Sequence, residues 1–498
     1  MDKRASGVLM HISSLPGQYG IGSFGQAAYD FVDFLEASHQ SYWQLLPLTT
    51  TSYGDSPYQS FSAVAGNPHF IDLDMLVEAG YLEKEDLVGV DFGSDPEVVD
   101  YARIFMVRRP LLEKAVRALL ESPATANFER FKQENRAWLL DYADFMAFKE
   151  HFDNRSLQEW GDDAAIQRDS VRVAELRKEL SAVVTYHQVV QYFFFSQWAA
   201  LKDYANVHGI EIIGDMPIYI SADSVEVWTQ PHLFKLDPDC KPRYIAGVPP
   251  DNFSATGQLW GNPIYDWEAH KKEDYAWWIF RIQESFKLYD YLRIDHFKGF
   301  SDFWQIPGGD ETAVRGKWVP GPGYDLFRAV KESLGDLNII AEDLGNIDEK
   351  ARQLLADCGY PGMKIMEFGF YDIKGKSIDI PHHYTAHSVA YTGTHDNEVV
   401  NGWYQNLTQE QRDYTDAYIN RRAGEPITRA FLRTLFATVS DTAIATMQDI
   451  LDKPASSRMN LPNTVGQNWK WRMVSEDLTE DKIEFLKDIT ERYNRGKD

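Results

Sequence analysis

The sequence predicts a (β/α)8 barrel, a ring of eight parallel strands that alternate with helices. Eight apolar stretches of strand length are separated by stretches with the spacing of helices. Three of these strand-like stretches run into acidic residues, at Asp295, Glu342 and Asp396. Because a parallel barrel forms its site at the carboxyl ends of its strands, these three acids indicate one shared pocket.

Length and composition bound the class of protein. The 498 residues are many for one domain, but a barrel with large insertions reaches this length. We therefore expect a single catalytic unit over residues 1–498, with no separate C-terminal domain. The net charge of −25 disfavours nucleic-acid and membrane-surface partners, so a neutral partner is the better hypothesis.

Cysteines and hydropathy exclude several other classes. The two cysteines, Cys240 and Cys358, lie far apart, which indicates neither a disulfide framework nor a zinc site. We expect no metal and no other cofactor. Neither a signal-peptide core nor a membrane span is evident, so we expect a cytoplasmic protein.

The first two strands and the helix between them come early in the chain. Residues 6–12 (SGVLMHI) form the first expected strand, and the glycine-rich loop at 13–25 is interpreted as a cap on the barrel. The loop lacks the acidic residue that should follow a dinucleotide fingerprint, which also disfavours a doubly wound sheet. Residues 26–38 have helical spacing, and 42–48 form the second strand. Tyr58, in the next loop, is either a substrate platform or a tyrosine packed on the rim.

Two insertions follow. Residues 75–202 are strongly charged and helical in pattern, and we interpret them as a helical insertion with solvated faces. The third strand, 209–215, ends at Asp215, which either serves the site or caps the rim. Residues 222–285 form a loop-rich insertion before the fourth strand. Within it, 247–263 is a long turn-rich loop of the kind that forms active-site lids.

The fourth expected strand, 291–295, contains two charged residues on which the predicted site depends. Side chains alternate along a strand, so Arg293 and Asp295 point the same way. An adjacent arginine favours the ionised form of a carboxyl group, which suits a nucleophile. The alternative is an ion pair with a purely structural role.

The last strands complete the ring. A Gly/Trp-rich loop is expected at 304–327, and Asn468 lies in a final polar and aromatic loop. The remaining expected strands are 339–342, 363–368, 388–392 and one near 458–460.

Tryptophan is frequent in stretches without strand or helix patterns. Indole faces suit the flat apolar faces of sugar rings, although large cores also use aromatic residues. The tryptophans in question are Trp260, Trp267, Trp304, Trp318, Trp403, Trp469 and Trp471.

The acids suggest a specific chemistry. Adjacent strands lie about 4.8 Å apart, so Asp295 and Glu342 on neighbouring strands can approach the spacing of about 5–5.5 Å that retaining glycosidases use. Asp295 would be the nucleophile, and Glu342 the acid and then the base, with its pKa raised by the neighbouring charge. Asp396, with His395 beside it, would stabilise the transition state. Alternatively, Glu342 and Asp343 form an acidic pair that caps a helix.

Seven motifs then carry a family resemblance. They are GDSPYQSFSAVAGNP at 54–68, GDMPIYI at 214–220, GVPPDNFSATGQLWGNPIY at 247–265, LRIDHFKGF at 292–300, AEDLG at 341–345, GTHDN at 393–397 and RMNLPNT at 458–464. With them the sequence resembles the 4-alpha-glucanotransferases of glycoside hydrolase family 77, in the alpha-amylase clan. The resemblance implies a retaining barrel enzyme without a metal cofactor.

The resemblance also implies roles for individual residues. Asp295 matches the nucleophile, Glu342 the acid/base and Asp396 the transition-state stabiliser. Phe253 lies in the stretch that matches a mobile active-site loop, and Asn468 is a further candidate. Residues that match substrate-binding positions are Arg293, His395, Tyr58, Asp215, Gln258 and Trp260. One departure is Glu398-Val399, where the family pattern leads us to expect Asp-Thr.

The expected activity is transfer of α-1,4-glucan segments between maltooligosaccharides, or to glucose. An α-glucan hydrolase with the same acids is the nearest alternative. A non-catalytic glycan-binding protein would not need acids at three strand ends. A metal-dependent hydrolase that uses His395, Asp396 and Glu342 is disfavoured because the cluster has a single histidine.

Overall fold

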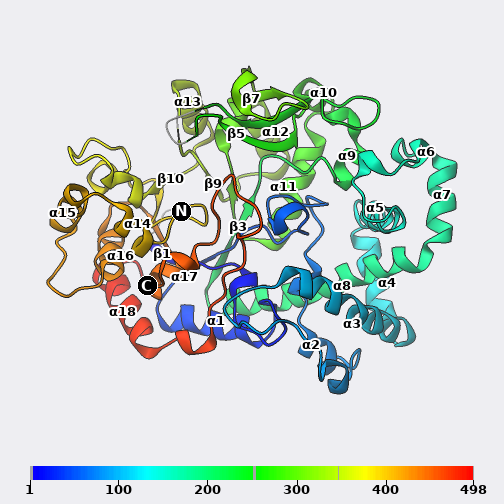
Figure 1. Ribbon diagram of the computed structural model, residues 1–498, viewed down its shortest axis with the longest axis horizontal. Helices are drawn as coiled ribbons and strands as arrows, with labels where there is room; N and C mark the ends of the chain where they lie inside the picture. Colours follow the sequence, from blue (N-terminus) through cyan, green and yellow to red (C-terminus); the bar gives the residue numbers. More distant parts are fainter. Residues whose placement is uncertain (1–3, 251–253, 346, 497–498) are drawn as a thin grey trace.

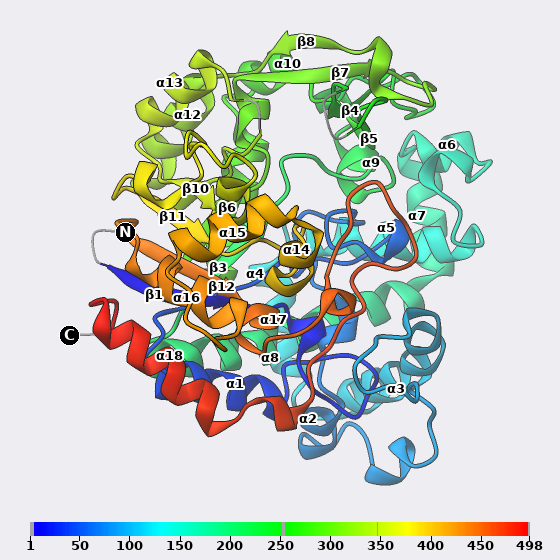
Figure 2. The same ribbon diagram turned by 60° about the vertical axis from the view of Figure 1, so that its left-hand side comes forward.

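An eight-stranded parallel sheet, curled into a barrel, lies at the centre of the computed structural model, which describes residues 4–250, 254–345 and 347–496 (Figures 1 and 2). The strand order is β10-β11-β12-β1-β2-β3-β6-β9, and the Ala341 N–H donates to the Pro361 carbonyl (3.0 Å) where β9 meets β10. This confirms the predicted (β/α)8 barrel. The strands are β1 (Ala5–Leu9), β2 (Tyr42–Gln44), β3 (Glu211–Met216), β6 (Tyr291–Ile294), β9 (Ile339–Ala341), β10 (Gly362–Ile365), β11 (Ser388–Tyr391) and β12 (Thr442–Thr446).

The barrel strands are short and enclosed on both faces. All five residues of β1 are buried, as expected for a parallel strand covered by helices outside and by side chains inside. Gly7 lets β1 and β2 approach closely, because a Cβ atom there would lie 2.5 Å from Cβ of Tyr42. The barrel therefore tolerates no side chain at this position.

Helices fill the range that was expected to be a helical insertion. Gln191 of α8 exchanges hydrogen bonds with the backbone of Gly66 (2.7 and 2.9 Å), and Gln197 does so with Asp72 (2.7 and 3.1 Å). These amides fasten α8 to the loop that follows β2. The helices up to this point are α1 (Gln26–Ala37), α2 (Leu73–Glu78), α3 (Tyr101–Glu121), α4 (Thr125–Glu134), α5 (Leu139–His151), α6 (Asp163–Ile166), α7 (Ser170–Glu179) and α8 (Ser181–Val207).

The second half of the chain alternates strands and helices more regularly. Its helices are α9 (Val225–Thr229), α10 (Trp267–Lys272), α11 (Ala276–Leu288), α12 (Tyr324–Leu334), α13 (Glu349–Cys358), α14 (Val400–Asn406), α15 (Gln409–Tyr418), α16 (Ile427–Ala437), α17 (Met447–Ile450) and α18 (Glu480–Arg492). The treatment of 75–202 and 222–285 as separate insertions stays a prediction.

Two stretches expected to be loops instead contribute to a four-stranded antiparallel sheet beside the barrel. The sheet order is β5-β4-β7-β8, and the expectation of a turn-rich loop at 247–263 and a Gly/Trp-rich loop at 304–327 was wrong for these parts. The strands come from two distant segments, so their pairing is a long-range contact that local patterns do not reveal. They are β4 (Tyr244–Val248), β5 (Gln258–Pro263), β7 (Asp302–Pro307) and β8 (Lys317–Pro320).

The eighth barrel strand was also misplaced. It is β12, which pairs with β11 on one side and β1 on the other, and not the stretch near 458–460. The β12 sequence, TAIAT, is short and made mostly of small residues, so it was absorbed into the helical pattern around it. Residues 458–460 instead form a loop, in which the Asn460 N–H donates to the His395 carbonyl (3.0 Å).

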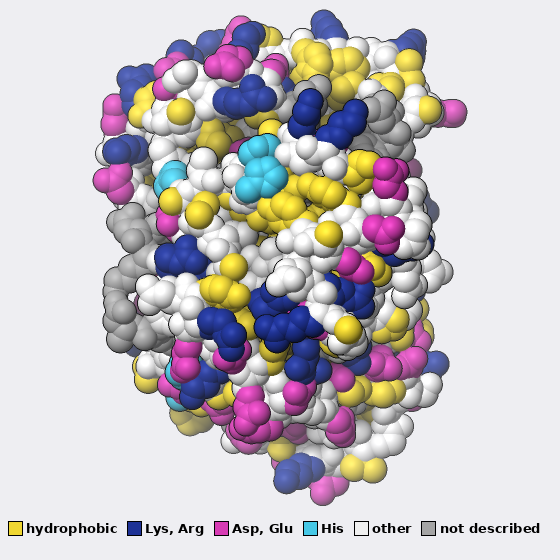
Figure 3. Space-filling view, turned by 90° about the vertical axis from the view of Figure 1, so that its left-hand side faces the viewer, with side chains coloured by type: hydrophobic (Ala, Val, Ile, Leu, Met, Phe, Trp, Pro, Cys, Tyr) yellow, Lys and Arg dark blue, Asp and Glu magenta, His cyan; other side chains and the backbone are white. Residues whose placement is uncertain are grey.

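The surface bears mixed charge. On the face in Figure 3, Lys and Arg side chains lie among Asp and Glu side chains. Despite the net charge of −25, the acidic side chains therefore form no single patch on this face. Within the described ranges, the structure contains no helix with the length and apolar character needed to cross a membrane.

Candidate active site

Asp295 and Glu342 follow neighbouring barrel strands at the same edge. Ile294 of β6 pairs with Ala341 of β9, so each acid directly follows the last paired residue of its strand. The Glu342 N–H donates to the Ile294 carbonyl at 3.0 Å, and the Asp295 N–H to the Met216 carbonyl at 3.0 Å. With strands about 4.8 Å apart, this register brings both carboxyl groups to one edge of the barrel.

Arg293 orients Asp295 and also holds Asp215. Its Nη1 donates to both Asp215 oxygens (2.7 and 2.6 Å), and its Nη2 to Asp295 Oδ1 (2.8 Å). Burial acts against the charge of Arg293, but Asp215 and Asp295 raise its pKa well above the ordinary value. Burial raises the pKa of Asp215, and the guanidinium opposes that shift. A structural ion pair and the candidate nucleophile thus share one cation.

Glu342 is set apart from Asp295 by its surroundings. It is 9% exposed, and its two oxygens accept backbone N–H groups from His296 and Leu344, both at 2.7 Å. Burial first, and the charge of Asp295 second, raise the pKa of Glu342 to about 7. His296 has a left-handed backbone (φ +52°), in the turn from which its N–H meets Glu342. A carboxyl group with such a pKa can both give and take a proton near neutral pH.

Helix capping does not account for Glu342 and Asp343. The N-cap of α13 is Asp348, whose side chain accepts from the Ala351 N–H. Asp343 instead accepts the N–H of Met363 on β10 (2.7 Å), so it closes the barrel between β9 and β10.

Asp396 follows β11 and is held by a loop from later in the chain. Its Oδ1 accepts from Asn460 Nδ2 (2.6 Å) and lies 3.4 Å from His395 Nε2, while the side chain is 44% exposed. Arg458 Nη2 donates to the Asp396 carbonyl (2.7 Å), and Arg458 Nη1 lies 3.5 Å from Glu398 Oε2. Glu398, the departure from the family pattern, therefore pairs with the arginine that supports Asp396.

An aromatic wall connects Asp215 with His395. Tyr58 donates its hydroxyl to Asp215 Oδ2 (2.7 Å), and its ring stacks on His395 with centroids 5.0 Å apart. The ring of Trp469 lies 5.9 Å from that of His395. Burial, and then the charge of Asp215, raise the pKa of Tyr58 well above its ordinary value, so its hydroxyl remains a donor.

The chain also matches a known family, because residues 10–477 fit the model described as 4-alpha-glucanotransferase of glycoside hydrolase family 77. The chain belongs to this family. A 4-alpha-glucanotransferase of Streptococcus pneumoniae serotype 4 is 58% identical over 496 residues, which cover 99% of this chain and 98% of that protein. One of Clostridium butyricum is 45% identical over 488 residues (98% and 100%).

Solved structures agree with this assignment. The amylomaltase of Streptococcus agalactiae, solved in complex with acarbose, has a TM-score of 0.98 at 63% identity and covers 99% of this chain and 100% of its own. The amylomaltase of Corynebacterium glutamicum shares the fold, with a TM-score of 0.80 at 18% identity, over 99% of this chain and 75% of that one. The chain is thus a glycosyltransferase-type enzyme, a 4-alpha-glucanotransferase whose substrates are α-glucans.

The remaining candidate substrate-binding residues of this glucanotransferase are Trp260, Gln258, Phe253 and Asn468. Trp260 of β5 places its ring edge-on to His296, with centroids 4.8 Å apart, and donates Nε1–H to Gln258 Oε1 (3.0 Å). Phe253 lies outside the described residues. The Asn468 amide donates to the Thr464 carbonyl (2.9 Å) and its oxygen accepts the Leu461 N–H (3.0 Å), so it shapes the loop after Asn460. Its contact with substrate stays a prediction.

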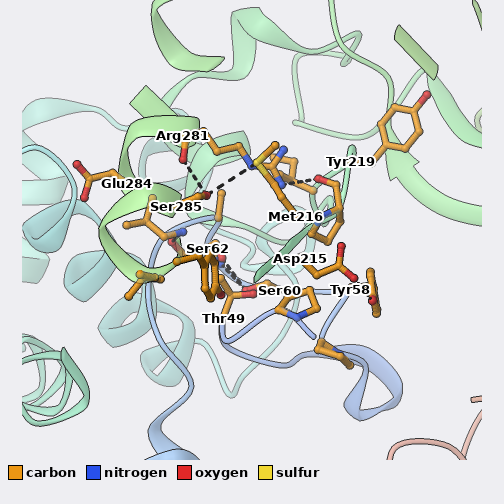
Figure 4. A pocket seen from close by; sticks show the side chains of 18 of the residues that line it. Thr49, Tyr58, Ser60, Ser62, Asp215, Met216, Tyr219, Arg281, Glu284 and Ser285 are labelled. Carbon is orange, nitrogen blue, oxygen red and sulfur yellow. Dashed lines mark hydrogen bonds between the residues drawn. The ribbon is translucent and has the colours of Figure 1, made fainter. Parts of the chain in front are cut away.

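A pocket extends from this cluster behind β3. Tyr58 and Asp215 lie at one end of it, and Arg281, Glu284 and Ser285 of α11 lie at the other (Figure 4). Tyr58 and Asp215 thus lie between the cluster of carboxyl groups and the residues that pack β3 against α11.

Sequence reasoning missed the supports of Asp396 and Glu342. Arg458 and Asn460 were expected inside a strand, although both lie in the RMNLPNT motif, which was the available signal. The N–H groups of His296 and Leu344 belong to the backbone, and no pattern of side chains predicts that they point at Glu342.

Proposed function

We propose that this 4-alpha-glucanotransferase works by a retaining double displacement, with Asp295 as nucleophile, Glu342 as acid and base, and Asp396 as transition-state stabiliser. The observation that carries this proposal is the pairing of β6 with β9, which sets an arginine-bound Asp295 beside a buried Glu342. Two carboxyl groups with different environments, at the ends of adjacent strands, suit the two roles of a retaining mechanism.

In the first step, an Asp295 oxygen attacks C1 of an α-1,4-linked glucan. Glu342 gives its proton to the glycosidic oxygen, the bond from C1 to that oxygen breaks, and a shortened chain leaves. The pKa of about 7 keeps much of Glu342 protonated near neutral pH, as this step requires. Asp396, oriented by Asn460, holds sugar hydroxyls and stabilises the positive charge that develops on the ring.

In the second step, the ionised Glu342 takes the proton of a 4-hydroxyl group as that oxygen attacks C1 of the glycosyl-enzyme. Asp295 leaves, and a new α-1,4 bond joins donor segment and acceptor. We propose maltooligosaccharides as donors, and glucose or maltooligosaccharides as acceptors. Trp260 beside His296 offers an aromatic surface that can position the acceptor and displace water.

Acarbose provides a probe of this cluster, because the Streptococcus agalactiae amylomaltase was solved with it. We expect acarbose to bind among Asp295, Glu342 and Asp396 in this chain and to compete with maltooligosaccharide donors.

The test is incubation of the purified protein with maltotriose and EDTA, with products separated by chromatography. Transfer predicts glucose together with chains longer than three units, and loss of both in Asp295→Asn. The matched control is Asp91→Asn, which makes the same exchange at a side chain that is 61% exposed. Glucose and maltose with nothing longer would instead identify a hydrolase.

A further inference from the structure

Trp318 is the tryptophan that packing does not explain. Of the seven tryptophans in loop-like stretches, Trp403, Trp469 and Trp471 are buried, and Trp260, Trp267 and Trp304 are half-buried. Trp318, in β8, is 43% exposed. Tryptophan is enriched at binding interfaces because it combines a large apolar face with a polar N–H group, so Trp318 is a candidate contact surface for a ligand.

The indole is braced from behind and from the side. Trp318 is paired with Trp304 of β7, and their rings meet edge-on with centroids 5.2 Å apart. Trp304 is itself fixed by a hydrogen bond from Nε1 to the Ala313 carbonyl (2.8 Å). Lys298, only 8% exposed, places Nζ 4.5 Å from the centroid of the Trp318 ring. The ring is therefore preorganised, which reduces the entropy lost when a ligand stacks on it.

The same lysine ties Trp318 to both catalytic loops. Lys298 Nζ donates to Asp302 Oδ1 (2.5 Å) and to Asp348 Oδ2 (2.9 Å). Lys298 follows Asp295 by three residues, so their Cα atoms lie within about 11 Å of each other. Asp348 ends the loop that starts at Glu342, and α13, which it caps, lies beside β7 in both ribbon views (Figures 1 and 2).

The position of Trp318 matters for the reaction, because the leaving group departs on the side of the glycosidic bond where the general acid lies. The acceptor arrives on the same side in the second step. Trp318 is connected to the loop that carries the general acid, and the Asp302 and Asp348 carboxylates near Lys298 are hydrogen-bond acceptors for sugar hydroxyls.

We propose that Trp318 forms a remote subsite for the leaving and acceptor chain, where a glucose ring stacks on the indole and its hydroxyls bind Asp302 and Asp348. The inference rests on the proposed function and adds a preference for chains long enough to reach β8. Short substrates do not reach this subsite, so long and short substrates distinguish it from the catalytic centre.

The kinetic test compares kcat/KM for maltoheptaose with kcat/KM for maltotriose. Trp318→Ala is expected to lower the ratio of the two about 3- to 10-fold, the loss of one aromatic stacking contact. Trp318→Phe should restore most of it. The control is Val207→Ala, at an 84% exposed apolar residue of α8, which should leave the ratio at the wild-type value. An unchanged ratio in Trp318→Ala overturns the inference, while transfer from maltotriose in the wild type upholds the proposed function independently.

A direct binding test does not depend on the folding of a Trp318 variant. The inactive Asp295→Asn protein is oxidised by hydroxyl radicals with maltoheptaose, with maltotriose or without sugar, and Trp318 oxidation is measured by peptide mass spectrometry. Protection by maltoheptaose well beyond that by maltotriose supports the subsite. Equal oxidation in all three samples overturns it.

Discussion

Replacing Glu342 by glutamine should make the fold more resistant to alkaline pH while stopping transfer. Burial and the charge of Asp295 raise the pKa of Glu342 from 4.5 to about 7. Between these values the unfolded chain has released a proton that the folded protein keeps. The unfolded state binds fewer protons there, so this residue lowers the stability of the wild type as pH rises. Glutamine does not ionise and escapes this loss.

The magnitude follows from the two pKa values. A gap from 4.5 to about 7 corresponds to about 3.4 kcal/mol, and about 2.5 kcal/mol of it falls between pH 5 and pH 8. Against this, glutamine cannot accept both N–H groups from His296 and Leu344, which costs about 1–3 kcal/mol at every pH. This cost cancels when two pH values are compared, so the quantity to measure is the change with pH of the stability difference between variant and wild type. For 498 residues the unfolding entropy is about 1.0 kcal/mol/K, so about 2.5 kcal/mol corresponds to about 2–3 °C.

The assay is calorimetry of the wild type and Glu342→Gln at pH 5, 6, 7 and 8, at one scan rate. The Tm of the variant minus that of the wild type should increase by about 2–3 °C from pH 5 to pH 8. Asp295→Asn removes the second cause of the shift, so its own Tm should fall less with pH than that of the wild type. A difference between Glu342→Gln and wild type that stays constant, or narrows with rising pH, would refute the reasoning.

Three further predictions concern the rate and the supports of the acids. The kcat/KM of the wild type should fall above about pH 7 as Glu342 loses the proton that the first step needs, and a rate that keeps rising would contradict this. Arg293→Lys should lower kcat/KM more than 100-fold, because an ammonium cannot bridge Asp215 and Asp295 as the guanidinium does, and wild-type activity would disprove the bridge. Asn460→Ala should lower kcat about 10- to 100-fold at similar KM, whereas a change in KM alone would show that it does not orient Asp396.

The fold was predictable where strands are apolar and end in charge. The stretch that leads to Asp295 is apolar apart from Arg293 and mostly buried, so its local pattern is enough to find β6. β12 was missed because its five residues are mostly small and begin shortly after α16 ends, so they carry little pattern of their own. The antiparallel sheet was missed because β4 pairs with β7, and the residues that decide this pairing are far apart in the chain.

The residues of the candidate site likewise divide into those that a local sequence pattern identifies and those that it does not. Asp295, Glu342 and Asp396 were selected as candidates because each ends an apolar stretch, and the barrel topology explains why they converge. Asn460 was not found as a support, because it lies 64 residues from Asp396 in a loop without periodicity. The hydrogen bond from the His296 N–H to Glu342 depends on a local backbone turn, which side-chain identity does not specify.

The most direct test of the central claim is to trap the glycosyl-enzyme on Asp295. Glu342→Gln is mixed with α-maltotriosyl fluoride, whose fluoride leaves without an acid, and the missing base slows the second step. The protein is then digested and its peptides are sequenced by mass spectrometry. A maltotriosyl group on Asp295 is the predicted result. The same group on Asp396, or turnover with no sugar bound to any carboxylate, would contradict the account.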